Sequence, residues 1–598
     1  MKAGNDYHNA LFSIFQKVWN SEFIPEQWHD TKIIQLYKGK GDMDEFSSQR
    51  HIHIKLEIPK LFGHIVMSQV KPILLENMSK FQIGTKTGHR PQEHLFTLKS
   101  VIALHSFMGS AIIVQLYDIA KFFDRESLRD GMNSIYNYGV VGKLYRLLFN
   151  MNKDTRITVQ TAVGCSEPIK TGENIGQGTQ EGANISAANI DFTINKYFRN
   201  SAHEISYGNV RLQPLLFQDD ITRIANSVKS AQSGNVRIEW SLESKLLDLN
   251  FDKSCYLLLG SKRAKNKISE ELEVNPLKLC GKNMKNVLQE KLLGDIVSSD
   301  GLAESVAATV NRRKGQVLSN IVEIRAVVDD YRSKSLGGLI TAFEIWELAV
   351  LPFLLYNCET WTEITPKTIK TLNELQQKFY RTILCTPRSC PIPALLWETG
   401  SWLMEHRIAL KKIMFLHHLF NLSENSLAHQ IACVQKSLGY PGLVSECIVL
   451  MNKYNIPEDP KMYSKLQWKK LCKSKISEKN KYDILESVRS YKKLSYDKLS
   501  KEKFEIKGYL KKMAPADARL KFSLRARMTR TVQTNYKGDP VYSKNKWLCV
   551  ECSNVDTQEH VIVCPNYANL RIGKDLEKDE DLVRYFRNVI AVREARYS

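Results

Sequence analysis

The stretch Leu215-Leu216-Phe217-Gln218-Asp219-Asp220-Ile221 sets two adjacent carboxylates between two apolar runs. This pattern predicts a β-hairpin with Asp219 and Asp220 at its turn, where both side chains rise out of a buried sheet. Carboxylate oxygens are hard ligands that hold divalent cations. Because an Asp-Asp pair also suits a solvated turn or a helix N-cap, its meaning depends on what accompanies it in the chain.

A third carboxylate, Asp118, ends the apolar run that begins at Val114, about a hundred residues before the hairpin. Phosphoryl transfer by two metal ions needs carboxylates from separate strands, because cations roughly 3.5–4 Å apart must be bridged. We therefore expect Asp118, Asp219 and Asp220 to be catalytic and to hold two Mg²⁺ ions, or Mn²⁺ in their place.

Between these carboxylates stands Gly176-Gln177-Gly178, whose glycines let the backbone approach a flat partner closely. In order and spacing, this segment, the aspartates and Asn250-Phe251-Asp252-Lys253 resemble the successive palm motifs of reverse transcriptases. Leu292-Leu293-Gly294-Asp295 resembles the short hairpin motif that follows the palm in those enzymes. The resemblance implies RNA-templated addition of deoxynucleotides to a primer 3′-hydroxyl, with the three aspartates binding the metal ions.

The resemblance also implies roles for three further side chains. Phe123 would lie under the sugar of the incoming nucleotide and leave no room for a 2′-hydroxyl, which favours deoxynucleotides. Gln177 would pack against the templating base pair, and Lys253 would neutralise or protonate the leaving pyrophosphate. From the residues alone, Phe122 or Phe123 also fits a plain core position, and Lys253 fits a solvated turn.

A basic glycine turn follows the expected strand that begins at Lys32. Lys38, Lys40 and Arg50 can form a cationic group for an incoming triphosphate, since Arg forks two oxygens and Lys acts as a point charge. A solvated basic turn is the alternative. The segment resembles the fingers of non-LTR retrotransposon reverse transcriptases, which favours a functional Arg50.

Composition limits the class of protein. The chain has 598 residues, 43% of them hydrophobic, and a formal net charge of +21, which indicates a polyanionic partner such as nucleic acid. The apolar stretch 337–356 contains Glu344, Glu347 and Pro352, so it predicts a buried helix and no membrane partner. Twelve scattered cysteines and the lack of a secretory signal predict an intracellular, reducing location.

The segment 451–550 holds 26 Lys and Arg against 10 Asp and Glu. Such regional charge predicts a nucleic-acid-binding surface, with a solvated helical surface as the alternative. Six interleaved aromatic residues fit either base stacking or a hydrophobic core: Tyr463, Trp468, Tyr482, Tyr491, Tyr496 and Tyr509.

Near the end, Cys549, Cys552, His560 and Cys564 are spaced C-x₂-C-x₇-H-x₃-C. Three thiolates and one imidazole complete a tetrahedral zinc site, structural because no position is left for water. Unliganded cysteines are the alternative. The spacing resembles the Cys-Cys-His-Cys unit near the C-terminus of several non-LTR elements, where it helps to hold RNA or target DNA.

The fold expected from these motifs is an α+β right-hand polymerase of fingers, palm and thumb, followed by a basic α-helical region and a small zinc knuckle. The expected parts are an N-terminal helical segment (1–30), fingers (31–110), palm (111–298), helical thumb and connection (299–450), basic helical region (451–545), knuckle (546–566) and C-terminal helix (567–598). The chain resembles a non-LTR (LINE-type) reverse transcriptase that is truncated at its N-terminus and lacks an endonuclease domain. Its expected partners are template RNA, primer or target DNA, and deoxynucleoside triphosphates.

Two alternatives to a reverse transcriptase stay open. An RNA-dependent RNA polymerase is one, because five residues separate Asp118 from Asp124 and such enzymes use a second carboxylate to sense the 2′-hydroxyl. Phe123 and the segment around Gln177 argue against it. The other is an inactive or co-opted retroelement remnant that binds nucleic acid without polymerising.

Overall fold

A computed structural model describes residues 4–39, 41–45, 48–161, 163–171, 175–199, 201, 204–329, 338–491, 494, 499–528, 548–549 and 551–595. The chain divides into two compact units, Met1–Ser305 with His418–Glu446, and Val306–His417 with Cys447–Ser598. Every strand among the described residues lies in the first unit, and the second unit is helical. The mixture of helix and sheet agrees with the expected α+β class.

The helices of the first unit cover its two larger sheets. They are α1 Asn5–Ser21, η1 Glu26–His29, α2 Glu57–Asn77, α3 Pro91–Phe107, α4 Phe122–Arg125, α5 Leu128–Asn137, α6 Gly142–Asn152, α7 Gln180–Phe198, α8 Val228–Glu243, α9 Lys262–Val274 and α16 Leu427–Leu438.

The strands range from eight residues to two. They are β1 Asp30–Tyr37, β2 Gln49–Lys55, β3 Ala111–Tyr117, β4 Arg156–Thr161, β5 Gly164–Cys165, β6 Ile169–Lys170, β7 Ser206–Tyr207, β8 Val210–Arg211, β9 Leu215–Phe217, β10 Asp220–Ala225, β11 Cys255–Gly260, β12 Lys278–Leu279, β13 Lys282–Asn283, β14 Lys285–Asn286, β15 Gln289–Leu292 and β16 Asp295–Ser298.

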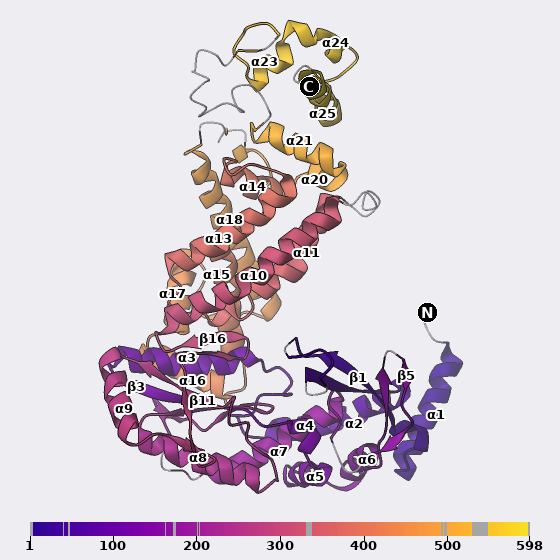
Figure 1. Ribbon diagram of the computed structural model, residues 1–598, viewed down its shortest axis with the longest axis vertical. Helices are drawn as coiled ribbons and strands as arrows, with labels where there is room; N and C mark the ends of the chain where they lie inside the picture. The colour runs from indigo at the N-terminus through magenta and orange to yellow at the C-terminus, as the bar shows by residue number, and fades with distance from the viewer. Residues whose placement is uncertain are drawn as a thin grey trace. The chain divides into compact units, whose positions relative to one another are not determined.

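The central sheet has the strand order β14-β11-β3-β10-β9. Strand β3 is buried at every position and pairs antiparallel with both β10 and β11. Helix α3 covers one side of this sheet and α8 the other (Figure 1). The side chain of Gln115 donates a hydrogen bond of 2.7 Å to Asn235 of α8, so odd-numbered positions of β3 face that helix. The last residue of β3 and the start of β10 therefore meet at one end of the sheet.

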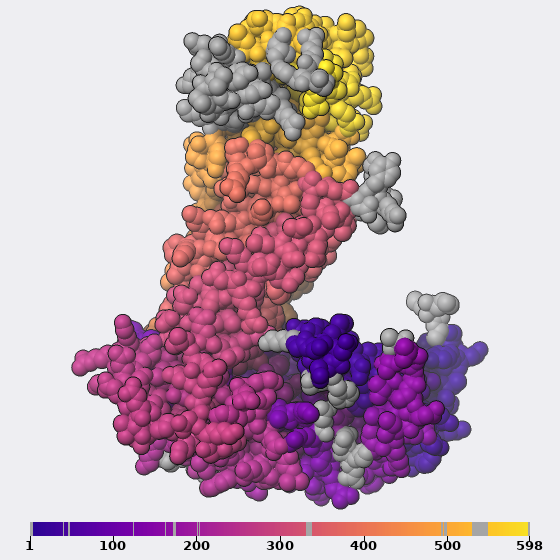
Figure 2. Space-filling view, viewed as in Figure 1, coloured from indigo at the N-terminus to yellow at the C-terminus, as the bar shows by residue number. Residues whose placement is uncertain are grey.

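The second sheet joins β2-β1-β4-β5, with β6 also on β4. Strands β1 and β2 form an antiparallel hairpin in which Ile33 faces His53, and β1 runs parallel to β4. The hairpin, drawn in indigo, lies at the surface in Figure 2. The expected N-terminal helix is α1, whose Val18 packs into a core with Phe62 of α2.

The helices of the second unit, of which α10, α15 and α17 cross its boundaries in the chain, pack around two separate cores of the described residues: one contains Trp346, Trp361 and Trp397, and the other contains Tyr567, Tyr585 and Phe586. They are α10 Leu302–Asp329, α11 Leu339–Ile345, the π-helix η4 Trp346–Val350, α12 Leu351–Leu354, η5 Cys358–Thr360, α13 Pro366–Leu384, α14 Ile392–Thr399, α15 Met404–Phe420, α17 Leu443–Lys453, η6 Pro460–Met462, α18 Lys465–Val488, α20 Gly508–Lys512, α21 Pro515–Arg525, α23 Gln558–Val563, η8 Pro565–Tyr567, α24 Ala568–Arg571 and α25 Asp579–Glu594.

The apolar face expected in this unit is present on α13. Leu372, Leu375, Phe379 and Ile383 are all buried, as their helical spacing predicts. Across the described residues, none of the helices combines the length and the apolar character needed to cross a membrane.

The aromatic residues of the basic segment divide between core and surface. Trp468 and Tyr509 are buried, so they stabilise the helical core and do not stack on bases. Tyr482 is 54% exposed, and the Lys479 ammonium lies 4.7 Å from the centre of its ring. Tyr496 lies outside the described residues.

Candidate active site and metal centre

The three aspartates come together at the end of the central sheet. Tyr117 of β3 faces Ile221 of β10, and continuing this antiparallel register by one residue sets Asp118 opposite Asp220. Residues that face each other in this way have Cβ atoms about 4.5–5.5 Å apart. Asp219 stands in the β9–β10 turn directly before Asp220. The predicted hairpin is present, but its turn is formed by Gln218 and Asp219, and Asp220 is the first residue of β10 and not a turn residue as the sequence predicted.

Like charges crowd at this edge. Burial, joined by the charge of Asp118, raises the pKa of Asp219 above its ordinary value. Desolvation raises the pKa of Asp220 to about 6, and the charges of Asp219 and Asp118 act in the same direction. A bound cation would relieve this repulsion.

The turn beside the aspartates is held by a side chain from far away in the sequence. Gln218 has a left-handed backbone (φ 57°), which is uncommon outside glycine. The buried Gln82 amide accepts a hydrogen bond of 3.0 Å from the Gln218 N–H and donates one of 3.1 Å to its carbonyl. A Cβ added to Gly84 would lie 2.4 Å from the Gln218 nitrogen. The Gln82-Ile83-Gly84 segment therefore fixes the position of Asp219.

Two lysines approach the aspartates. The Lys253 ammonium lies 3.3 Å from an Asp118 oxygen, and both side chains are partly exposed. The positive charge of Lys291, on β15, acts against the rise in the pKa of Asp220. Lys253 thus lies beside Asp118, and its expected position at the leaving pyrophosphate stays a prediction. Sequence reasoning missed Lys291.

A pocket of about 370 Å³ brings Phe123 and Gln177 together. Phe122 is fully buried in the core of the unit, whereas Phe123 is only partly buried against that core and also lines the pocket. His51, His53 and Lys55 line the same pocket from β2. These three residues alternate along the strand and so share one face. Sequence reasoning missed them because the register of the hairpin decides which face meets the pocket.

The Gly176-Gln177-Gly178 loop lies directly on β2. The His53 N–H donates a hydrogen bond of 2.8 Å to the Gln177 carbonyl. A Cβ on Gly176 would lie 3.1 Å from the His53 ring, and one on Gly178 (φ +99°) would lie 3.0 Å from Ile52. Gly178 is therefore favoured by its left-handed backbone, and at both positions a side chain would crowd the strand.

Lys38, Lys40 and Arg50 are the residues expected to bind a triphosphate, and this stays a prediction. Arg50 is an exposed residue of β2, and by alternation its side chain lies on the face opposite His51 and His53. Lys38 follows β1, and neither Lys38 nor Arg50 lines the pocket of Phe123 and Gln177. Lys40 lies outside the described residues.

A buried carboxyl, Glu126, lies behind the aspartates. It accepts hydrogen bonds from the Ser186 hydroxyl and, at 3.0 Å, from Asn189, both on α7. Burial raises the pKa of Glu126 to about 7, and the charge of Asp219 acts in the same direction. The side chain of Asp124, for which the sequence predicted a helix cap, lies outside the described residues.

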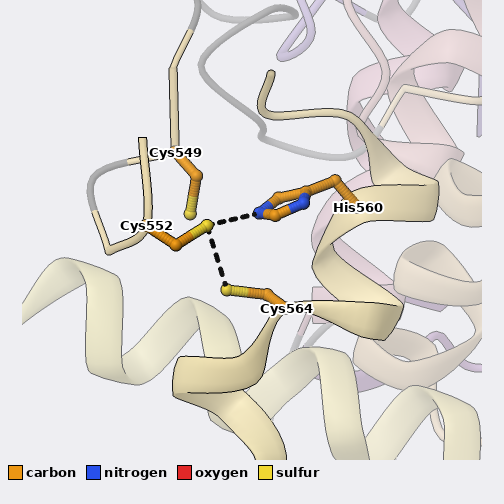
Figure 3. Close-up of side chains that lie close together, drawn as sticks. All are labelled: Cys549, Cys552, His560 and Cys564. Atoms are coloured by element: carbon orange, nitrogen blue, oxygen red, sulfur yellow. Dashed lines mark hydrogen bonds between the residues drawn. The ribbon is translucent and has the colours of Figure 1, made fainter. Parts of the chain in front are cut away.

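The ligand atoms of Cys549, Cys552, His560 and Cys564 all lie within 4.8 Å of one another (Figure 3). The Cys552 sulfur lies 3.2 Å from His560 Nε2 and 3.7 Å from the Cys564 sulfur. The donor set of three thiols and one imidazole suits tetrahedral zinc. Within the described ranges this is the one such group of three or more His, Cys, Asp or Glu residues, and the aspartates are not gathered as closely.

The C-terminal helix α25 supports this cluster. Arg593 donates hydrogen bonds of 2.8 and 2.9 Å to both carboxylate oxygens of Asp556, and one of 2.9 Å to the Tyr567 hydroxyl. Its guanidinium also lies 3.9 Å from the Cys549 sulfur. The Tyr585 hydroxyl donates to the Val561 carbonyl at 2.6 Å. Spacing alone predicted the four ligands but not these contacts.

Comparison with known proteins gives no close relative. No protein-family model and no curated protein matches the chain. Among solved structures, it is similar to telomerase of Candida albicans in complex with a fragment of telomeric RNA, at 12% identity over 73% of this chain and 66% of that chain (TM-score 0.35). It is also similar to apo telomerase of Candida tropicalis, at 9% identity over 78% of this chain and 74% of that one (TM-score 0.34).

A telomerase of Candida tropicalis truncated from its C-terminal domain matches at 9% identity and a TM-score of 0.32, over 48% of this chain. This chain spans 59% of the length of that telomerase. Similarity at this level establishes neither a family nor an activity.

Proposed function

We propose that this chain is an RNA-directed DNA polymerase that derives from a non-LTR retrotransposon and extends a primer 3′-hydroxyl with deoxynucleotides. The observation that carries the proposal is the position of Asp118 opposite Asp220, next to Asp219, at one end of the central sheet. The pocket that contains both Phe123 and Gln177 supports it further.

Each residue has a distinct part in the proposed reaction. Asp118, Asp219 and Asp220 would hold two Mg²⁺ ions, which supply charge neutralisation and activation of the attacking hydroxyl when bound. Phe123 excludes a 2′-hydroxyl, and Gln177 supports the base pair. Lys253 stands beside Asp118, where its ammonium can neutralise the charge that develops on the leaving pyrophosphate.

The proposal includes a structural zinc ion at Cys549, Cys552, His560 and Cys564. It also assigns template RNA and primer or target DNA to the basic region 451–545. Exposed lysines of α18 support this assignment, since Lys465, Lys469, Lys470 and Lys473 all reach solvent. Under this proposal, residues 31–110 act as fingers, 111–298 as palm and 299–450 as thumb and connection, in an intracellular enzyme.

Binding without catalysis is the second candidate function. It is favoured by one observation: the ammonium of Lys253 pairs with Asp118 at 3.3 Å. A protein of this kind would bind RNA in a salt-sensitive manner and leave the primer unextended in the presence of Mg²⁺.

The test is primer extension on an RNA template with Mg²⁺, comparing deoxynucleotides with ribonucleotides. Extension with deoxynucleotides is the expected result. Extension with ribonucleotides would instead indicate an RNA-dependent RNA polymerase. Retained binding of the primer–template without any extension would indicate the binding function.

A further inference from the structure

A cationic pocket of about 620 Å³ lies at the C-terminal end of α13, and it shares no residue with the sites described above. Lys378, Arg381 and Arg388 line it, with Glu374 as the opposing charge. Its other lining residues are polar: Gln377, Thr382 and Thr386. The lining of this α13 pocket therefore carries a net charge of +2 and offers hydroxyl, amide and guanidinium donors.

A helix C-terminus ordinarily repels anions, because its last carbonyls carry partial negative charge. Here two of those carbonyls accept hydrogen bonds from arginines of other helices. Arg325 of α10 donates to the Thr382 carbonyl, and Arg519 of α21 donates to that of Ile383 at 2.9 Å. Asp329 balances part of this charge, since Arg519 lies 2.9 Å from it. The pocket thus keeps its positive character.

Arg381 is held weakly by its neighbours. Its guanidinium contacts Gln377 at 3.5 Å and the Cys390 carbonyl at 3.4 Å, both at the long end of hydrogen-bond distances. In the part of the chain that is described, its buried Nε and the buried Thr386 hydroxyl have no hydrogen-bond partner. Phosphate oxygens are the acceptors that best match a forked guanidinium with a hydroxyl beside it.

The sequence of α13 extends this site along the helix. Lys367, Lys370, Lys378 and Arg381 recur at spacings that place them on one helical face, together with Glu374. At 1.5 Å per residue, the 367–381 stripe spans about 21 Å. A single small anion would occupy one point of such a stripe, whereas the backbone of a nucleic acid can contact its whole length.

We propose that the α13 pocket binds a phosphodiester group of an RNA or DNA backbone that runs along the 367–381 stripe. The occupant rests on the proposed function, since it assumes that this chain handles nucleic acid. The net charge of +21 supports a polyanion as the ligand.

The experiment is equilibrium binding of a labelled single-stranded RNA to the full chain over a range of salt concentrations. The variant Arg381→Met/Arg388→Met removes two charges from the pocket. The matched control, Lys262→Met/Arg263→Met, removes two exposed charges from α9. We expect the pocket variant to bind at least about tenfold more weakly and to lower the salt slope by about one to two, with the control near wild type. Equal binding by the two variants would overturn the proposal.

Further measurements separate the possible causes. The single variant Arg388→Met changes only an exposed side chain, so it tests the pocket even if the double variant misfolds. We expect it to weaken RNA binding less than the double variant does. Arg381→Lys keeps the positive charge but loses the planar guanidinium that can donate two parallel hydrogen bonds. Its RNA affinity should therefore lie between those of the wild type and Arg381→Met. Inorganic phosphate is the second probe: stabilisation by phosphate that the pocket variant loses, with unchanged RNA binding, would show a free-phosphate site and refute a backbone site.

The outcomes also distinguish this inference from the proposed function. If the pocket variant binds RNA as the control variant does and the wild type extends primers, the proposed nucleic-acid site in the α13 pocket is refuted and the proposed function is not. A wild-type chain that binds no nucleic acid refutes both.

Discussion

The strand-edge aspartates and the Cys/His cluster are both candidate metal sites, but they are built in opposite ways. The four ligands of the cluster come from 16 consecutive residues, whereas Asp118 is about a hundred residues from Asp219 and Asp220. A turn and one short helix gather the cluster within 4.8 Å. The aspartates come together only through the pairing of β3 with β10, so their relative positions depend on that pairing.

The chemistry of the ligands widens this difference. Thiols and imidazole are neutral before they bind a metal, so they can be packed together without repulsion. Desolvation, together with repulsion among the aspartates, raises the pKa of Asp220 to about 6, and the Lys253 ammonium lies beside Asp118. A closed structural site and an open catalytic site are the expected uses of these two arrangements.

The largest expected effect is on the gathered cluster. Cys564→Ser should weaken zinc binding by about a thousandfold, because one ligand of a complete tetrahedral set is lost. Chelator competition measures this, with the exposed Cys165→Ser as the matched control. One tightly held zinc ion per Cys564→Ser chain would contradict the assignment.

The next largest effect concerns the pocket that contains Phe123 and Gln177. Phe123→Ala should reduce the preference for deoxynucleotides over ribonucleotides by about a hundredfold, because space for a 2′-hydroxyl appears. The ratio of kcat/KM values for the two nucleotides measures it. An unchanged ratio would remove Phe123 from the nucleotide pocket.

The burial of a carboxyl behind the aspartates has its own test in Glu126. Its folded-state pKa of about 7 lies above the ordinary value, so the folded chain favours the protonated form and loses stability as the pH rises from about 4.5 to 7. Glu126→Gln should therefore stabilise the chain by on the order of 2 kcal/mol at pH 8 and by little at pH 4.5. Thermal unfolding at both pH values checks this. An equal gain at both would show that ionisation of Glu126 is not the cause.

The smallest expected effect concerns the contacts that helix α25 makes with the Cys/His cluster. Arg593→Met should weaken zinc binding by about tenfold, because the guanidinium that holds Asp556 and lies against Cys549 is lost. Arg584→Met, an exposed change on the same helix, serves as the control. Identical zinc affinity in the two variants would leave Arg593 without a role at the metal.

Local features were predictable from the sequence. The Asp219–Asp220 hairpin, the buried face of α13 and the gathering of the Cys/His ligands all depend on short-range spacing. Such patterns carry over to the structure because turns and helices form between near neighbours.

Long-range features were not predictable in the same way. The contact of Gln82 with Gln218 joins residues 136 positions apart. The choice of His51 and His53 over Arg50 for the pocket face depends on strand register, because a slip of one residue exchanges the two faces. Periodicity also left open whether Trp468 stacks on bases, and only its burial decides that it belongs to the core.

The most direct test of the account compares Asp220→Asn with the wild-type chain on one RNA template and DNA primer with Mg²⁺ and deoxynucleotides. Extension rate and primer–template affinity are measured on the same preparations. We predict that the variant loses at least about a thousandfold in extension rate and keeps its affinity within about threefold, because a metal ligand is lost and no nucleic-acid contact is. Equal extension by the two chains would contradict the central claim, and so would wild-type binding without extension.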